Sequence, residues 1–156
     1  MRFRLLVVDD NAVVCQFLGE ALADRGYSVR VARDGREALA LFVETPADLL
    51  ITDYEMPLLD GIGLIRTVKA LRPETVALLL TGESLPEIVA EAATAGAREV
   101  IRKPFNLAAL IERVEGIRQE RRDSSGEEIG PGRDTAQAPG GSDGTDDRAG
   151  DNLAPG

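Results

Sequence analysis

Two adjacent carboxylates, Asp9 and Asp10, close the apolar run RLLVV, and a third, Asp53, closes the run DLLIT. Thr81 ends a later apolar run, and Lys103 follows another. Three carboxylates within about 5 Å of each other repel by about 3 kcal/mol per pair at an effective dielectric near 20. One lysine offsets only one of these charges. The residue types therefore predict a divalent cation, and an all-oxygen site suits Mg²⁺ better than a soft metal.

The segments that must position these residues alternate between two patterns. Apolar runs with β-branched residues are separated by segments that place apolar residues three and four positions apart, as amphipathic helices do. Gly26 and Gly96 fall where helices should end, and Pro86 falls where one should begin. This alternation predicts an α/β fold with helices on both faces of a parallel sheet. We expect strands at residues 4–9, 28–32, 48–53, 75–80 and 98–102.

The expected sheet is a flavodoxin-like, doubly wound (βα)5 arrangement with five parallel strands in the order 2-1-3-4-5. Ligands of such sheets lie beyond the carboxyl ends of the strands, where the strand order reverses. Strands 1 and 3 are neighbours in this order, so Asp9, Asp10 and Asp53 should meet in one crevice, with Thr81 and Lys103 on its other side. Asp10 or Asn11, taken alone, could instead cap the following helix. A helix cap does not explain the polar residues at the other strand ends.

Composition narrows the possible chemistry. Histidine is absent from the 156 residues, which removes Ser-His-Asp and Cys-His catalysis and histidine-based metal sites. The net charge of −9 argues against general nucleic-acid binding, which needs a basic surface. Cys15 is the single cysteine and cannot form an internal disulfide, in agreement with a reducing compartment. Its apolar neighbours indicate a small core residue on a helix.

The composition changes at residue 123. Residues 123–156 hold eight acidic and two basic residues, half of the 16 glycines, and only two large aliphatic residues. Such a segment cannot bury enough apolar surface to offset the entropy of ordering it. We therefore expect one folded domain over residues 1–122, with a net charge of −3, and a disordered, Gly- and Asp-rich acidic tail over residues 123–156.

No targeting or membrane segment is expected. No apolar stretch approaches the roughly 20 residues that span a bilayer. The first apolar run follows two arginines, but it meets Asp9 too early for a signal peptide, and no small-residue cleavage site follows. We expect a cytoplasmic protein without a membrane partner.

The motifs LLVVDDN, DLLITDYEMPLLDG, ALLLTGES and GAREVIRKPF resemble the response-regulator receiver domains of two-component signalling, and in particular stand-alone receivers of the chemotaxis-regulator kind. The resemblance extends from about residue 4 to residue 120. It implies that Asp53 is the phosphoacceptor, and that Asp10, Asp53 and the backbone carbonyl of Glu55 hold Mg²⁺, with Asp9 acting through a bound water. It further implies that Lys103 pairs with the phosphoryl group and that Thr81 hydrogen-bonds to it.

The same resemblance implies a function and a geometry. A single-domain response regulator takes part in its own phosphorylation and dephosphorylation but is not a conventional enzyme. The phosphoryl group would come from a sensor histidine kinase or a histidine phosphotransfer protein, and the output would pass to a downstream protein target whose identity stays open. No DNA-binding segment follows residue 122 in this sequence, so we do not expect direct transcriptional output. The Lys103–Pro104 peptide bond should be cis, because Lys103 must turn back into the pocket.

One departure from the family pattern leaves the output open. Receivers usually carry an aromatic residue three positions before the lysine, where this chain has Val100. A phosphorelay shuttle or phosphate sink without output of its own is therefore an alternative. A Mg²⁺-dependent hydrolase with an aspartyl nucleophile is a weaker one, because Glu55 stands where it would need a second aspartate. A flavin-binding module is disfavoured, because the loop after the first strand carries negative charge where a phosphate would lie.

Three further residues lie next to the predicted site in the sequence. Glu55 and Glu83 lie two residues after Asp53 and Thr81, which places both side chains at the rim of the pocket. They are either solvated rim charges or groups that tune the hydrolysis of the acyl phosphate. Tyr54 should point away from the pocket into packing, because successive strand residues face opposite sides.

Overall fold

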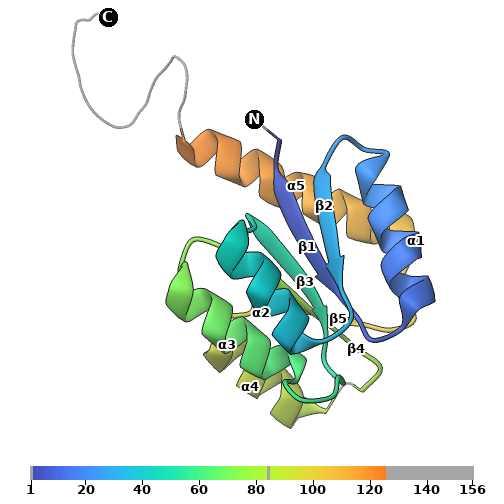
Figure 1. The fold of residues 1–156 in the computed structure, drawn as a ribbon, viewed down its shortest axis with the longest axis vertical. Coiled ribbons are helices and arrows are strands. Elements are labelled where there is room, and N and C mark those ends of the chain that lie inside the picture. The colour runs from blue at the N-terminus through green and yellow to red at the C-terminus, as the bar shows by residue number, and fades with distance from the viewer. Residues whose placement is uncertain (1, 84, 126–156) are drawn as a thin grey trace, which may run out of the picture. The chain divides into compact units, whose positions relative to one another are not determined.

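The structure is a computed structural model that describes residues 2–83 and 85–125 of the chain. Within these residues five strands alternate with five helices (Figure 1). The strands are β1 (Arg4–Val8), β2 (Ser28–Ala32), β3 (Leu49–Asp53), β4 (Val76–Thr81) and β5 (Glu99–Arg102). The helices are α1 (Ala12–Ala23), α2 (Gly35–Glu44), α3 (Gly61–Leu71), α4 (Pro86–Ala95) and α5 (Leu107–Ser125).

The five strands form one parallel sheet in the order β2-β1-β3-β4-β5, which confirms the predicted fold. Val8, at the end of β1, lies opposite Ala32 of β2 and Thr52 of β3. Asp53, at the end of β3, lies opposite Leu80 of β4. This register brings the carboxyl ends of the three central strands to the same edge of the sheet, where the strand order reverses.

Helices α2, α3 and α4 cover one face of the sheet. A single apolar cluster joins them to residues that alternate along the strands, such as Leu6 and Val8 of β1 and Leu50 of β3. Helix α1 packs against β1 and β2 without joining this cluster, and it lies on the other face (Figure 1). The right-handedness of the crossovers explains why α1 lies on a different face from α2, α3 and α4. The chain crosses the sheet in one direction from β1 to β2 and in the opposite direction from β2 onward, so the connecting helices change face.

Side chains at their N-caps start three of the helices. Asn11 accepts hydrogen bonds from the backbone N–H groups of the first turn of α1, Asp34 does so for α2, and Asp60 does so for α3. Helix α4 differs, since its N-cap is Leu85 and no side chain caps it; Pro86 provides its first residue. Gly96 ends α4 at a φ of 112°, in the left-handed conformation that glycine adopts without strain.

The sheet and the first four helices belong to one unit, which ends at Leu107. Helix α5 is described by itself: its buried residues Leu110, Ile111, Val114 and Ile117 recur along one stripe. It extends to Ser125, three residues beyond the boundary expected at residue 122. The predicted acidic tail lies outside the described residues from position 126 onward. No helix in the described part of the chain is long and apolar enough to cross a membrane.

Candidate functional site

Three carboxylates meet at the carboxyl edge of the sheet. Asp9 directly follows β1, Asp10 comes next, and Asp53 is the last residue of the adjacent strand β3. One oxygen of each side chain lies within 4.8 Å of the others. Asp9 and Asp53 are buried, with 1% and 7% of their surface exposed, whereas Asp10 is exposed. The predicted cluster is therefore present, and its oxygen donors match the preference of Mg²⁺.

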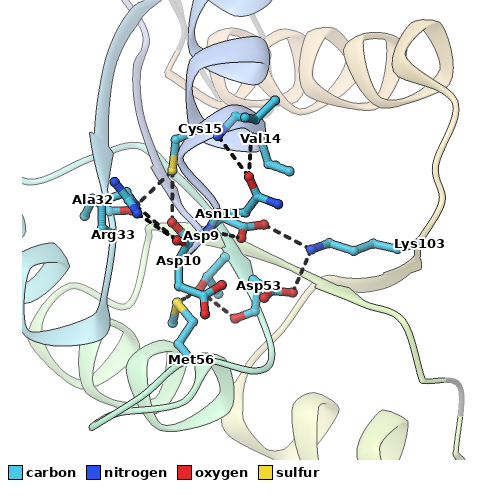
Figure 2. A network of polar contacts seen from close by, with 12 residues as sticks. Asp9, Asp10, Asn11, Val14, Cys15, Ala32, Arg33, Asp53, Met56 and Lys103 are labelled. Carbon is cyan, nitrogen blue, oxygen red and sulfur yellow. Dashed lines mark hydrogen bonds and ion pairs between the residues drawn. The ribbon is translucent and has the colours of Figure 1, made fainter.

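Lys103 joins two of these carboxylates from the opposite side (Figure 2). Its Nζ lies 3.0 Å from Asp9 Oδ2 and 3.0 Å from Asp53 Oδ1. The backbone N–H of Lys103 donates a 2.7 Å hydrogen bond to the Thr81 carbonyl, which fixes the loop after β5 to the end of β4. The Lys103–Pro104 peptide bond is cis, as predicted.

The charges of the site are unequally matched. Burial raises the pKa of Asp53; the hydrogen bond from Lys103 opposes this rise, and the charge of Asp9 adds to it. Burial by itself would lower the pKa of Lys103, but the hydrogen bonds and charges of Asp9 and Asp53 outweigh it and raise the pKa. The ammonium therefore stays charged, and it does not fully compensate the carboxylates around it. The pocket can accept further positive charge.

The start of α3 is built against the last residue of β3. The backbone N–H of Gly61 donates to the Tyr54 carbonyl at 2.9 Å, and a Cβ at position 61 would overlap with the backbone carbonyl oxygen of Asp53. Asp60 caps the helix through a 2.8 Å hydrogen bond from the Gly63 N–H. Only glycine allows this approach, which explains the DG pair in the motif DYEMPLLDG.

The loop between β3 and α3 contains a strained turn. Leu58 has a φ of 74°, and the Leu59 N–H donates to the Pro57 carbonyl at 2.8 Å, which makes a three-residue turn around Leu58. A left-handed conformation costs a leucine about 1–2 kcal/mol, and its side chain is 75% exposed. The loop borders an open depression of about 510 Å³, lined by Asp10, Tyr54, Glu55, Met56, Pro57 and Asp60.

Residues 5–115 match the response regulator receiver domain family. The chain belongs to this family. A receiver is a phosphoacceptor that regulates other proteins rather than a classical enzyme, and receivers generally partner with histidine kinases. The cluster of Asp9, Asp10 and Asp53 is the acidic pocket typical of the magnesium-binding site of a receiver.

Comparisons with individual proteins agree with this family. The receiver is 39% identical over 118 residues to the response regulator MprA of Mycolicibacterium vanbaalenii, a match that covers 75% of this chain and 51% of that protein. It thus spans about half the length of the curated relatives it matches.

Two solved structures have the same fold. The receiver is 34% identical to the chemotaxis protein CheY4 of Vibrio cholerae, with a TM-score of 0.71 and coverage of 75% of this chain and 99% of the other. It is 28% identical to a CheY-like receiver domain protein of Methanospirillum hungatei, with a TM-score of 0.73 and coverage of 79% and 99%.

Thr81 lies where the sequence predicts, at the end of β4, and is 1% exposed. Its hydroxyl oxygen accepts a 3.0 Å hydrogen bond from the Glu83 N–H. The hydroxyl proton remains available for a donor role, because the hydrogen bond from Glu83 uses only a lone pair of the oxygen. Thr81 is thus next to the receiver pocket, with its oxygen engaged by the loop that leads to α4.

Glu55 and Glu83 form a pair of carboxyl groups at the rim. Both are exposed, and the hydrogen bond and charge of Glu83 raise the pKa of Glu55. Their proximity links the loop after β3 to the loop after β4. Whether they tune the lifetime of a phosphoryl group stays a prediction.

Tyr54 and Val100 both pack against the apolar cluster beneath α2, α3 and α4. Tyr54 therefore packs as predicted, although it also lines the depression that contains Asp10. Val100 lies opposite Leu79 in the pairing of β4 with β5. At the position where receivers usually have an aromatic side chain, this chain has a small residue that is already half-buried.

Two contacts of the receiver pocket were not predicted. The Cys15 thiol lies 3.1 Å from the Asp9 carbonyl oxygen and donates to it, so this core cysteine also contacts the backbone of the site, and burial raises its pKa. The guanidinium of Arg33 donates to the Asp10 carbonyl. A signal for the second existed, because Arg33 follows β2 at the same edge of the sheet.

Proposed function

We propose that Asp53 accepts a phosphoryl group from a sensor histidine kinase or a histidine phosphotransfer protein in a Mg²⁺-dependent reaction, and that the phosphorylated receiver signals through a protein partner. The observation that carries this proposal is the single ammonium of Lys103, which lies 3.0 Å from both Asp9 and Asp53 inside a cluster of three carboxylates. A purely structural ion pair would not need the third carboxylate, which is exposed and faces the same point.

The proposed reaction uses Asp53 as the nucleophile. One carboxylate oxygen attacks phosphorus, the P–O bond of an acyl phosphate forms, and the P–N bond of the donor phosphohistidine breaks. The histidine nitrogen keeps the electron pair of that bond. Because this chain contains no histidine, the donor must be another molecule; small phosphodonors are a second source.

The other pocket residues would hold charge and orientation. Asp10, Asp53 and the Glu55 carbonyl would hold Mg²⁺, with Asp9 acting through a water. When bound, the ion would neutralise charge on the transferring phosphoryl oxygens. Lys103 is a compact cation beside the Asp53 oxygen and would pair with a second phosphoryl oxygen. Thr81 would donate its free hydroxyl proton to a third.

The test is phosphorylation of the full chain with acetyl phosphate or a cognate kinase. We expect one hydroxylamine-labile phosphoryl group that requires Mg²⁺ and is absent from Asp53→Asn. The matched control is Asp24→Asn, which changes an exposed aspartate at the end of α1 and should label normally. Labelling of Asp53→Asn, or full labelling in excess chelator, would show that the assignment is wrong.

Val100 favours one alternative within the same chemistry. Because this residue is small and already packed, the protein would act as a phosphorelay shuttle or phosphate sink. In such a protein, the phosphoryl group should be transferred back to a histidine phosphotransfer protein faster than the acyl phosphate is hydrolysed. A response regulator with its own output should instead bind a target protein more tightly after phosphorylation. Measuring both rates and target binding separates the two functions.

The placement of the folded domain over residues 1–122, of the acidic tail after it and of the protein in the cytoplasm belongs to the same proposal. The boundary is supported by the change of composition at residue 123, where large aliphatic residues nearly disappear. The cytoplasmic location is supported by the single cysteine, which agrees with a reducing compartment.

A further inference from the structure

Arg33 holds the backbone of the acidic pocket from a different part of the fold. Its Nε and Nη2 donate hydrogen bonds of 3.1 and 3.0 Å to the carbonyl oxygen of Asp10, 23 residues earlier in the chain. Figure 2 shows the guanidinium beside the loop that carries Asp9 and Asp10. Two donors on one acceptor fix the direction of that carbonyl more closely than a single donor does.

The Asp10 carbonyl is not fixed by α1. This helix begins at Ala12. Its first backbone hydrogen bond runs from the Cys15 N–H to the carbonyl of the N-cap residue Asn11, one residue after Asp10. The Val14 N–H, which could reach the Asp10 carbonyl in a longer helix, donates to the Asn11 side chain at 3.3 Å. Among residues 2–83 and 85–125, no backbone N–H donates to the Asp10 carbonyl. Arg33 therefore provides its hydrogen-bond donors.

The three carboxylates differ in how their side chains are held. Asp9 Oδ1 accepts from the Asn11 N–H at 2.9 Å, and Asp9 Oδ2 pairs with Lys103. Asp53 Oδ1 also pairs with Lys103. In the described part of the chain, neither a hydrogen bond nor an ion pair holds the carboxylate of Asp10, so its direction depends on its backbone. Arg33 is the contact that holds this backbone.

Arg33 is itself anchored to the start of α2. Its backbone N–H donates to Glu37 Oε1 at 2.8 Å, and the Glu37 N–H donates to the capping residue Asp34 at 2.8 Å. This reciprocal arrangement is a variant of the capping box, which fixes the chain where it enters a helix. The position of Arg33 is thus set by the helix and does not depend on the pocket it serves.

We propose that Arg33 is a positioning residue that holds Asp10 in the direction required for binding a divalent cation. The inference rests on the proposed function, which assigns Asp10 as a ligand. Arg33 does not touch the cation and acts only through the Asp10 backbone. Partners that orient metal ligands typically change metal affinity by 10- to 100-fold, and the exposure of this contact places the expected effect at the lower end.

Charge and position predict opposite effects, which makes the inference testable. Arg33 is a cation near a cation site, so by charge alone its removal should tighten Mg²⁺ binding. If Arg33 positions Asp10, its removal should weaken binding. Arg33→Lys retains the charge and loses the two-donor geometry, and Arg33→Gln loses both. Arg36→Gln is the matched control, because Arg36 is also exposed, lies in the first turn of α2, and makes no hydrogen bond or ion pair with the described residues.

The experiment is a titration of each metal-free full-length variant with MgCl₂, followed by amide NMR shifts. We expect Arg33→Lys and Arg33→Gln to bind Mg²⁺ roughly tenfold more weakly than the wild type. Arg36→Gln should bind up to about twofold more tightly, through charge alone. Before any Mg²⁺ is added, the Asp10 and Asn11 amides should already shift in Arg33→Lys, while the melting temperature stays within about 2 °C.

Two outcomes would overturn the inference while leaving the proposed function intact: wild-type affinity in Arg33→Lys, or tighter binding in Arg33→Gln matching the Arg36→Gln control. A wild-type protein that binds no Mg²⁺ would instead overturn the proposed function. The two failures are therefore distinguishable in one series.

Discussion

Asp53 pairs with Lys103 and is nonetheless held in a place that disfavours its charge. Burial raises its pKa, and Asp9 shares the same ammonium. Formation of an acyl phosphate requires the carboxylate form of Asp53. Without a bound cation, however, the folded protein favours the protonated form of this residue more than water does. The folded state keeps an unfavourable charge at the position where the proposed chemistry needs it.

This balance predicts a stabilised variant. Asp53→Asn should raise the free energy of unfolding at pH 7 in the absence of Mg²⁺ by roughly 1 kcal/mol. That is a fraction of the about 3 kcal/mol by which two carboxylates about 5 Å apart repel at an effective dielectric near 20, because Lys103 already offsets part of it. Urea unfolding followed by circular dichroism would measure the difference.

The pH dependence has a definite sign. Folding raises the pKa of Asp53 above 3.8. Protonated Asp53 therefore contributes to the free energy of unfolding fully below pH 3.8, and this contribution is lost as the pH rises through the raised pKa. The advantage of Asp53→Asn should therefore shrink as the pH falls toward 4, and saturating Mg²⁺ should remove it. Asp24→Asn serves as the exposed control. A gain that is equal at every pH would contradict the explanation.

Residue types at strand ends could be predicted from the sequence, whereas their loop contacts could not. Asp9, Asp53 and Lys103 follow apolar runs, so their convergence depends only on the strand order. The contacts of Arg33 and Cys15 depend on how two loops pack, and neither charge nor periodicity encodes that. The position of Arg33 after β2 places it at this edge of the sheet, but it does not specify the hydrogen bonds to the Asp10 carbonyl.

The four helices that surround the pocket begin in unequal ways. Side chains cap α1, α2 and α3, whereas α4 starts at Leu85 with no side-chain hydrogen bond. A capping side chain contributes about 0.5–2 kcal/mol to helix stability. The N-terminus of α4 therefore lacks the side-chain cap that stabilises the starts of α1, α2 and α3. Thr81 ends the strand that precedes α4, and its hydroxyl oxygen accepts a hydrogen bond from the Glu83 N–H.

The difference predicts where the receiver responds to a phosphoryl mimic. Beryllofluoride with Mg²⁺ should strongly shift the amides of residues 82, 83, 85, 87 and 88, because the Thr81 hydroxyl leaves the Glu83 N–H to reach the mimic. Shifts at Val100 and Ile101 should stay small, because valine is stiff about its first torsion and is already packed. Heteronuclear NMR of the full chain measures both sets.

Asp53→Asn is the control for this measurement, since it should show no shifts that depend on beryllofluoride. Strong shifts at Val100 and Ile101 with a quiet 82–88 segment would contradict the expectation. Such a pattern would mean that β5 transmits the signal despite its small side chain.

The sequence predicts the strands to within one residue at each end. The expected strand at 75–80 is β4 (Val76–Thr81), and that at 48–53 is β3 (Leu49–Asp53). Buried parallel strands are continuous apolar runs, which makes them easy to find. The turn around Leu58 was not predicted, because a leucine with a positive φ contradicts its local preference and is imposed by the surrounding fold.

Across the whole molecule the charge is concentrated toward the C-terminus. Residues 123–156 carry a net charge of −6, against −3 for residues 1–122. Like charges on the two parts repel weakly, and salt screens this repulsion beyond about 10 Å at 0.1 M ionic strength. From charge alone we therefore expect no electrostatic attraction between residues 123–156 and the acidic pocket.

A chain ended at Arg122 should keep its stability and its phosphorylation rate. We expect its melting temperature to lie within about 2–4 °C of the full chain, the range of changes that remove no buried contact. Differential scanning calorimetry and acetyl phosphate labelling would check this at low and high salt. A larger loss, or a labelling rate that falls on truncation, would mean that the segment after residue 122 contributes to the domain.

The contact of Gly61 with the end of β3 has a mechanical consequence. The Asp53 carbonyl occupies the place of a side chain at position 61, and the Gly61 N–H is bound to the Tyr54 carbonyl. The end of β3 and the start of α3 therefore have no clearance between them, and one cannot move without displacing the other. The two sides of the pocket therefore differ in how easily they can move. The start of α3 is fixed against β3, so we expect a charge added at Asp53 to displace the β4–α4 side.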